Sequence, residues 1–285
     1  MDPVEVVRGR VADAIFARVA GPDADEARTR IHFGPGERRF APDDPICRVH
    51  GDASMYVGGL RALLLQALHP LAMTGVDRHS RFRDDPWGRL QGTSRFIAET
   101  TFAPIEDGDR MIRVVKAMHQ KVTGIADDGR PYAASDPQLL RWVHVAEIDS
   151  FLAAHDRYGR RPLDPEERDG YVAQAAHTAI ALGAVDVPTT TAELVAALAE
   201  FRPQLASTPE ARRTARWLVL APHVPLAERG PYSILMAAAI GLMPRWTRWP
   251  LRLPWLPITE ATGVRLAATG LTRGIAWATA PPART

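Results

Sequence analysis

The stretch PWGRLQGTSRFIAETTFAPIEDGDRMIRVVKAMHQKVTG, residues 86–124, decides the fold because it predicts two consecutive helices. Pro86 fits the first turn of the first helix, where a missing amide hydrogen costs nothing. Pro104 opens the second helix in the same way, and the acidic residues after it complement the helix dipole. We expect the second helix to end at Gly124, because glycine commonly terminates helices.

Three polar side chains on these helices take positions that suit one site. Arg89 and Thr93 are four residues apart, so they share one side of the first helix. His119 shares an apolar face of the second helix with Ile112 and Val115. This combination is compatible with a pocket that holds one imidazole ligand and two polar groups, although an arginine four residues from a threonine is also common on ordinary helix surfaces.

Helical signals continue along most of the chain. A wide apolar stripe of Leu60, Leu63, Leu64 and Leu68 predicts a central, mostly buried helix over residues 52–73, with a kink or an end at His69-Pro70. The polar segment 75–86 after it is predicted to be turn-like. Alanine-rich blocks and capping patterns predict further helices at 135–159, 164–182, 191–201, 209–221, 231–243 and 258–277. No linker or repeat divides the 285 residues, so the sequence predicts a single all-α domain, 1–285.

Charge and composition narrow the partners and the location. The 35 basic and 33 acidic residues are interspersed, which argues against nucleic-acid binding. The N-terminus has acids where a signal peptide needs basic residues, and the apolar runs are short or interrupted. We therefore expect a cytoplasmic chain without a signal peptide or a transmembrane segment. Cys47, the only cysteine, is more typical of a small buried core residue than of a metal ligand.

Residues 244–255 are divided by prolines and carry Trp246, Trp249 and Trp255 among arginines. Indole and guanidinium groups favour boundaries between apolar and polar media. One interpretation is therefore a patch for peripheral contact with a membrane or with a partner protein. Ordinary packing of the tryptophans explains the same pattern.

The motifs of several enzyme classes are absent. The sequence has no G-x-S-x-G, G-x-x-x-x-G-K-[ST], G-x-G-x-x-G or H-E-x-x-H, which argues against hydrolases, kinases and nicotinamide enzymes. Histidines on apolar helical faces remain, and haem iron takes such an imidazole as an axial ligand. A lone buried histidine is also a common hydrogen-bonded core residue. Spacing alone therefore does not establish a cofactor site.

Four segments occur in a characteristic order along the chain. They are 61-RALLLQALHPLAMTGVDRHSRFRDDPWGRLQGT, VKAMHQKVTG around His119, PYAASDPQLLRWVH ending at His144, and PLDPEERDGY ending at Tyr171. Together they resemble the bacterial branch of the MpaB and latex-clearing-protein (rubber oxygenase) family. The resemblance is strongest over residues 48–200, and residues 201–285 are expected to complete the fold with C-terminal helices.

The resemblance implies a fold, a cofactor and site residues. The rubber oxygenases of this family are all-helical with a globin-like core, hold haem b, and cleave carbon–carbon double bonds with dioxygen. His119 resembles the family's proximal ligand to the haem iron. Arg89 and Thr93 resemble the polar pair on the distal side, where they would hydrogen-bond water or dioxygen.

Three further histidines lie inside the resembling segments. His69, His79 and His144 could each contact a haem propionate, orient the distal arginine, or bond only to a backbone carbonyl. Asp77 and Asp149 are candidate partners for them, and they also suit helix caps or the surface.

The chain also departs from the rubber oxygenases. These enzymes have a lysine just before the distal threonine, and here that position is Gly92. They are also secreted, whereas this chain carries no export signal. The same substrate is therefore not implied, and a small or lipophilic organic molecule is the better expectation.

The leading hypothesis is a haem b-dependent oxygenase that uses dioxygen, with an undefined redox partner. One alternative is a haem enzyme that uses peroxide. Another is a non-catalytic helical protein that binds haem or a lipid. Histidines in an apolar site can also hold non-haem iron.

Overall fold

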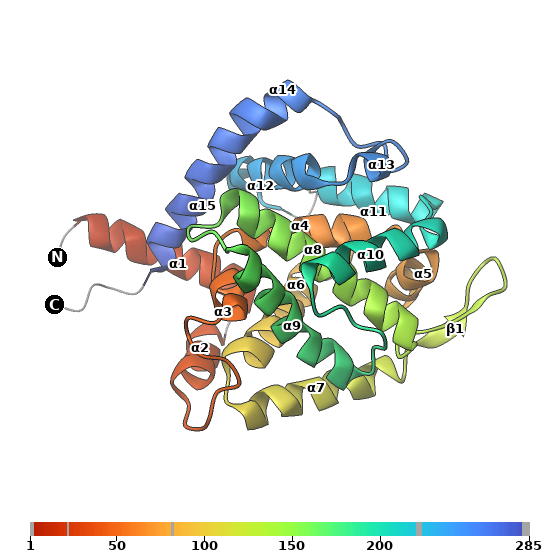
Figure 1. The fold of residues 1–285 in the computed structure, drawn as a ribbon. Coiled ribbons are helices and arrows are strands. Elements are labelled where there is room, and N and C mark those ends of the chain that lie inside the picture. The colour runs from red at the N-terminus through yellow and green to blue at the C-terminus, as the bar shows by residue number, and fades with distance from the viewer. Residues whose placement is uncertain (1–2, 22, 81–82, 221–223, 281–285) are drawn as a thin grey trace.

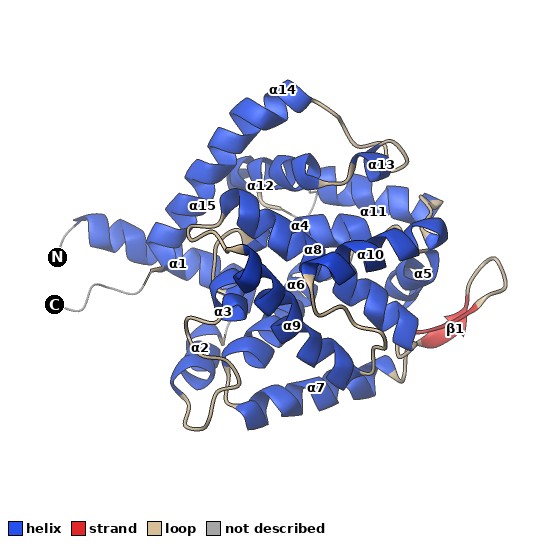
Figure 2. Ribbon diagram, in the orientation of Figure 1, coloured by secondary structure: helices blue, strands red, loops and turns tan. Residues whose placement is uncertain are grey.

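The computed structural model describes residues 3–21, 23–80, 83–220 and 224–280, and helices dominate it (Figures 1 and 2). The all-α prediction is confirmed. The α-helices are α1 Pro3–Ala20, α2 Ala24–Phe33, α3 Pro45–His50, α4 Met55–Gln66, α5 Pro70–His79, α6 Pro86–Phe102, α7 Ile105–His119, α8 Pro137–Tyr158, α9 Pro165–Leu182, α10 Thr191–Phe201, α11 Pro209–Leu220, α12 Arg229–Leu242, α13 Arg245–Arg248, α14 Pro257–Thr259 and α15 Arg265–Thr279. Short 3₁₀ helices lie at Arg202–Gln204 (η1) and Leu226–Glu228 (η2), and a π-helix, η3 Glu260–Val264, joins α14 to α15.

A small β-hairpin follows α7, where the sequence predicted the end of the second helix. β1, Thr123–Ile125, pairs antiparallel with β2, Pro131–Ala133. Gly129 has a φ of 82° in the turn between them, a conformation that glycine adopts without strain. The prediction that the helix reaches Gly124 is wrong. α7 ends at His119, because β1 begins and ends with β-branched residues that favour the extended backbone.

Helices α4 and α8 form the centre of the molecule and pack most extensively on each other (Figure 1). Gly58 makes this close approach possible. A Cβ atom at Gly58 would lie 2.9 Å from Cδ1 of Phe151 and 3.3 Å from Cβ of Ala154 on α8. A Cβ atom built at the neighbouring Gly59 would meet nothing within 4 Å, so Gly59 does not contact α8.

The helix predicted over residues 52–73 is divided in two. Pro70 starts a new helix, α5, and the imidazole of His69 caps it by accepting a hydrogen bond from the amide of Ala72 at 3.4 Å. α5 then continues to His79, into a segment that looked turn-like from its polar sequence. Proline at the first helical position accounts for the break.

A buried arginine ties three core helices together. Arg61 on α4 donates to the hydroxyl of Ser150 at 2.6 Å and pairs with the carboxylate of Asp149 at 2.7 Å, both on α8. It also donates to the carbonyl of Leu242 at the end of α12, at 3.0 Å. Its charge is therefore compensated within the core, as a buried ion requires.

Helices α6 and α7 position the predicted site residues. α6 packs on α1, α3 and α7, and α7 also packs on α9 along one edge of the molecule (Figure 1). In the described part of the chain, no helix has both the length and the apolar character that crossing a bilayer requires. The single-domain boundary, the globin-like core and the cytoplasmic location stay predictions.

Candidate functional site

Arg89 and Thr93 lie on the first turns of α6. The helix begins at Pro86, and the carboxylate of Asp85 caps it by accepting from the amide of Gly88 at 2.9 Å. The Thr93 hydroxyl donates to the Arg89 carbonyl at 3.1 Å, so in this rotamer its oxygen is left to accept a hydrogen bond. Both residues keep exposed surface.

Gly92 precedes Thr93 and borders open space. A Cβ atom built there would meet no heavy atom within 4 Å. Sterically, the backbone therefore accepts the lysine that rubber oxygenases have at this position. Its absence here is a feature of the sequence and not a consequence of crowding.

His119 is the last residue of α7 and is half-buried. Its Nδ1 atom is buried and has no hydrogen-bond partner among the described residues. Burial, and then the positive charge of Arg89, lower the pKa of His119. The structure therefore brings His119 and Arg89 within electrostatic reach and keeps the imidazole neutral, which is the form that ligates metals.

Glu147 on α8 is a site residue that motif reasoning missed. Burial raises the pKa of its carboxyl to about 7, opposed by a hydrogen bond from Gln66 and by the charge of Arg89. Burial in turn lowers the pKa of Arg89, while Glu147 raises it. The only signal in the sequence is the i, i+3 spacing of His144 and Glu147, which turns both toward one side of α8.

A second group missed from the sequence surrounds His50 at the end of α3. His50 Nδ1 lies 2.8 Å from the Thr101 hydroxyl on α6, and its Nε2 lies 3.3 Å from the Tyr171 hydroxyl on α9. Burial lowers the pKa of His50 to about 3. Burial and the charge of Glu147 hold the pKa of Tyr171 well above its usual value. These three residues are neutral, and the charge of Glu147 acts on Tyr171. The sign of this group in the sequence was Tyr171, the last residue of the fourth segment that resembles the family.

Two of the predicted histidines make contacts that support the fold. His69, besides capping α5, packs its ring 6.0 Å from Trp142 and 6.5 Å from Phe201. His79 is exposed, and its Nε2 lies 3.0 Å from the hydroxyl of Tyr132 in the hairpin. Their role beside a cofactor stays a prediction.

His144 is different, because it is buried on α8 and its Nε2 atom has no hydrogen-bond partner among the described residues. Burial lowers its pKa to about 4. It stands one helical turn before Glu147. His144 is therefore a second neutral imidazole with a free nitrogen near the site.

The aspartates considered as histidine partners pair with arginines instead. Asp77 forms an ion pair with Arg83, and Asp149 forms the one with Arg61. Cys47 is buried, and burial together with the charge of Asp44 raises its pKa to about 11, so the thiol is neutral. This agrees with the prediction of a core residue.

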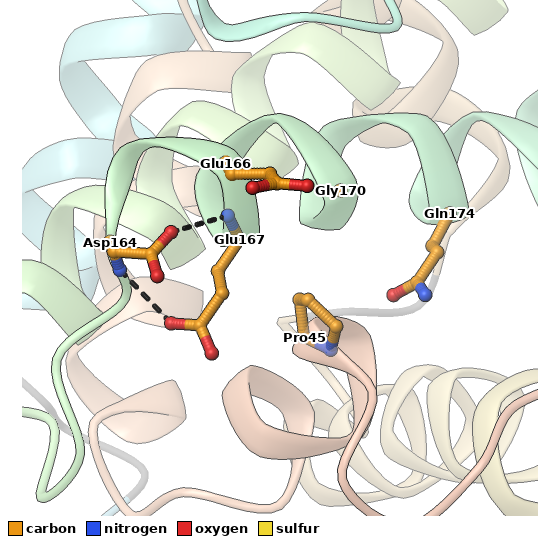
Figure 3. Close-up of a pocket in the computed structure, with 6 residues that line it drawn as sticks. All are labelled: Pro45, Asp164, Glu166, Glu167, Gly170 and Gln174. Atoms are coloured by element: carbon orange, nitrogen blue, oxygen red, sulfur yellow. Dashed lines mark hydrogen bonds between the residues drawn. The ribbon is translucent and has the colours of Figure 1, made fainter.

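A pocket between the starts of α3 and α9 is lined by Pro45, Asp164, Glu166, Glu167, Gly170 and Gln174 (Figure 3). Its acids form a helix cap. The Glu167 amide donates to Asp164 at 2.9 Å, and Glu167 accepts from the Asp164 amide at 3.0 Å. The capping box predicted there is confirmed. The carboxylates of Asp164 and Glu167 are therefore used by the fold.

The residues present fit a haem better than a bare metal ion. Within the described residues, no group of three or more histidine, cysteine or acidic side chains could hold a metal ion. Haem needs only one axial side chain, because the porphyrin supplies the other ligands. His119 offers a buried, unpaired ring nitrogen beside Arg89, and a bound group would satisfy that orphaned atom.

The fold is that of an all-helical protein. Residues 47–277 match the family model described as "ER-bound oxygenase mpaB/B'/Rubber oxygenase, catalytic domain". The chain belongs to this family, and its membership makes it an oxygenase with an undefined substrate. The match extends through the C-terminal helices, beyond the range of strongest resemblance. No curated protein and no solved structure matches the chain.

Proposed function

We propose that the chain is a haem b-dependent oxygenase that uses dioxygen to oxidise a small or lipophilic organic molecule. The observation that carries the proposal is the unpaired, buried Nδ1 of His119 beside the charge of Arg89 in a member of an oxygenase family. His119 would hold the haem through its neutral imidazole. The bound haem would supply the one-electron chemistry with oxygen that side chains lack.

Arg89 and Thr93 would form the polar side of the site. The Arg89 guanidinium stays charged and can stabilise negative charge that develops on oxygen as it is reduced. The Thr93 hydroxyl can accept a hydrogen bond from a bound water, because its proton is donated to the Arg89 carbonyl. Together they orient a small polar group next to a charge.

Glu147 would carry the proton in place of the lysine that the rubber oxygenases have just before the distal threonine, where this chain has Gly92. A carboxyl with a pKa of about 7 exchanges its proton readily near neutral pH. Gln66 on α4 hydrogen-bonds this carboxyl, and the charge of Arg89 on α6 favours its ionised form. Glu147 can thus deliver or accept a proton on the side where Arg89 offers its charge.

The face of α4 that ends at Gln66 favours a lipophilic substrate. Leu63 leaves 45% of its surface exposed although Leu64 and Leu65 beside it are fully buried. Gly59, one turn earlier, adds no side chain to cover it. This face therefore offers apolar surface next to the polar group that Gln66 contacts.

The test is the absorption spectrum of the full chain purified from haem-supplied cells. We expect a Soret band and a pyridine haemochrome spectrum of haem b, with iron matching haem. His119→Ala should lose both the band and the haem. His155→Ala should keep them, because it removes a buried imidazole on α8 whose Nδ1 also has no partner among the described residues but whose pKa does not respond to Arg89.

Two results would overturn parts of this proposal. A colourless wild-type protein from haem-replete cells rejects haem dependence, and iron without haem would replace it with non-haem iron. A full Soret band in His119→Ala together with loss of the band in His144→Ala would identify His144 on α8 as the haem ligand. Circular dichroism of each variant separates loss of haem from loss of fold.

A further inference from the structure

The C-terminal segment 244–280 exposes an unusual number of large apolar side chains. Trp246 is half-buried and packs against the core, with Arg202 stacked 5.2 Å from its ring centre. Several large apolar residues after Trp246 are exposed to solvent. The most exposed are Trp249 (90%), Ile258 (80%), Leu266 (75%), Trp255 (58%) and Leu256 (55%).

The backbone segments that carry these residues lie at the periphery of the molecule (Figure 1). In Figure 1 the helix made of α14, η3 and α15 extends outward beside α13, and the loop carrying residues 249–256 joins the two. On the long helix, Leu266 and Trp277 are eleven residues apart, three helical turns, so they share a face. Ala268, Thr272 and Ala276 occupy the opposite face and are buried. The helix thus packs through small residues and presents Leu266 outward, whereas the half-exposed Trp277 has the Arg8 guanidinium 5.9 Å from its ring centre.

A buried ion pair holds this edge in place. Arg248 of α13 donates to both carboxylate oxygens of Glu260 at 2.8 Å, and to the carbonyl of Met243 at 3.2 Å. The loop and the start of the long helix are therefore fixed to each other before any partner arrives. Presenting the apolar residues costs little additional conformational entropy on binding.

The charge of the edge is positive and unbalanced. Glu260 is the only acidic residue between positions 244 and 280, and Arg248 neutralises it. Arg252, Arg265 and Arg273 are exposed and form no ion pair with any carboxylate in the described part of the chain. Arg245 stacks 5.4 Å from the ring centre of Trp255. The edge therefore combines exposed indoles and aliphatic groups with arginines that lack counter-charges.

We propose that this edge, residues 249–277, docks on the surface of an anionic lipid bilayer. The indoles, Ile258 and Leu266 would enter the boundary between head groups and acyl chains, and the arginines would contact lipid phosphates. A second copy of the chain fits poorly, because symmetric pairing would bring arginine against arginine without an acid to separate them. The proposal does not depend on haem or on any activity of the site.

The test is flotation of the full-length protein with vesicles of phosphatidylcholine alone and of phosphatidylcholine mixed with phosphatidylglycerol. We expect binding to the mixed vesicles only, weakened by salt, with a blue shift of tryptophan fluorescence. The apolar variant W249A/I258S/L266S and the charge variant R252E/R265E/R273E should each bind at least about tenfold more weakly. The control variant F33S/V195S changes comparably exposed apolar residues on α2 and α10 and should bind like the wild type.

Three outcomes would overturn the proposal. One is absence of binding to the mixed vesicles. Another is equal binding by the apolar and control variants. The third is a concentration-dependent dimer in light scattering that the apolar variant abolishes, which would assign the edge to self-association. The sites are exposed, so melting temperatures of all variants should match, and this comparison excludes misfolding.

Discussion

Arg89 on α6 and Glu147 on α8 carry opposite charges into one site, and each shifts the pKa of the other. Burial raises the pKa of Glu147, and the charge of Arg89 opposes that rise, while Arg89 itself keeps exposed surface and stays charged. The site therefore keeps a charged arginine beside a carboxyl that is poised between its protonated and ionised forms at neutral pH. The charge of Arg89 also lowers the pKa of His119 at the end of α7.

Removing the arginine charge should raise two pKa values together. In Arg89→Gln, the carboxyl of Glu147 loses a stabilising charge and the imidazole of His119 loses a repelling one, so both pKa values rise. Nuclear magnetic resonance titration of the cofactor-free protein measures both. Arg95→Gln is the matched control, because Arg95 lies on the same helix and pairs with Glu99. Unchanged values in Arg89→Gln would show that the three groups do not interact.

Glu147 should make the folded state less stable at alkaline pH. Its folded pKa of about 7 exceeds the usual 4.5, so the folded state holds the proton more tightly. The resulting stability is present below about pH 4.5 and is lost as pH rises through about 7. Glu147→Gln should remove this dependence and gain up to about 3 kcal/mol at pH 8 relative to wild type. Urea unfolding of both proteins at several pH values checks the prediction, and parallel profiles would contradict it.

Burial of His144 should make the folded state less stable at acid pH. Its pKa is about 4 in the folded protein and about 6.5 when unfolded, so the unfolded state takes up the proton first. The stability it contributes is present above about pH 6.5 and is lost as pH falls toward 4. His144→Gln should lessen this acid loss by up to about 3 kcal/mol. The exposed His79→Gln serves as control, and an identical acid loss in both variants would reject the assignment.

The adjacent glycines of α4 should respond oppositely to alanine. Gly58→Ala places a Cβ atom 2.9 Å from the ring and 3.1 Å from the backbone of Phe151, so α4 and α8 must separate. We expect a loss of about 1–3 kcal/mol in the free energy of unfolding. Gly59→Ala meets nothing and should gain up to about 1 kcal/mol from helix propensity. Chemical denaturation measures both, and equal effects would mean that the helices do not meet at Gly58.

Local signals in the sequence were enough to predict most helices. The starts at Pro86 and Asp164 depend on caps and prolines within a few residues, and both appear in the structure. The hairpin after His119 escaped prediction, because three-residue strands have no periodicity that separates them from a helix end. Its local signs were the turn at Gly129 and the β-branched Thr123 and Ile125.

The site was less predictable, because packing between distant segments builds it. His50 and Tyr171 are separated by 121 positions and meet only because α3 packs on α9. Glu147 looks like an ordinary surface acid until the folded chain surrounds it. Arg89, Thr93 and His119 were selected through family resemblance, and helical spacing supplied only their faces.

The two glycines of α4 mark one side of the helix that tolerates larger side chains and one side that does not. On the side of Gly58 the helix is fixed by contact with α8, so a mutation there is removed by selection for folding. On the other side, a Cβ atom at Gly59 meets no heavy atom of the described residues within 4 Å, and Leu63 leaves 45% of its surface exposed, so larger side chains fit there without disturbing the contact with α8. On the substrate face proposed above, the residues at positions 59 and 63 can therefore be exchanged without changing the contact between α4 and α8.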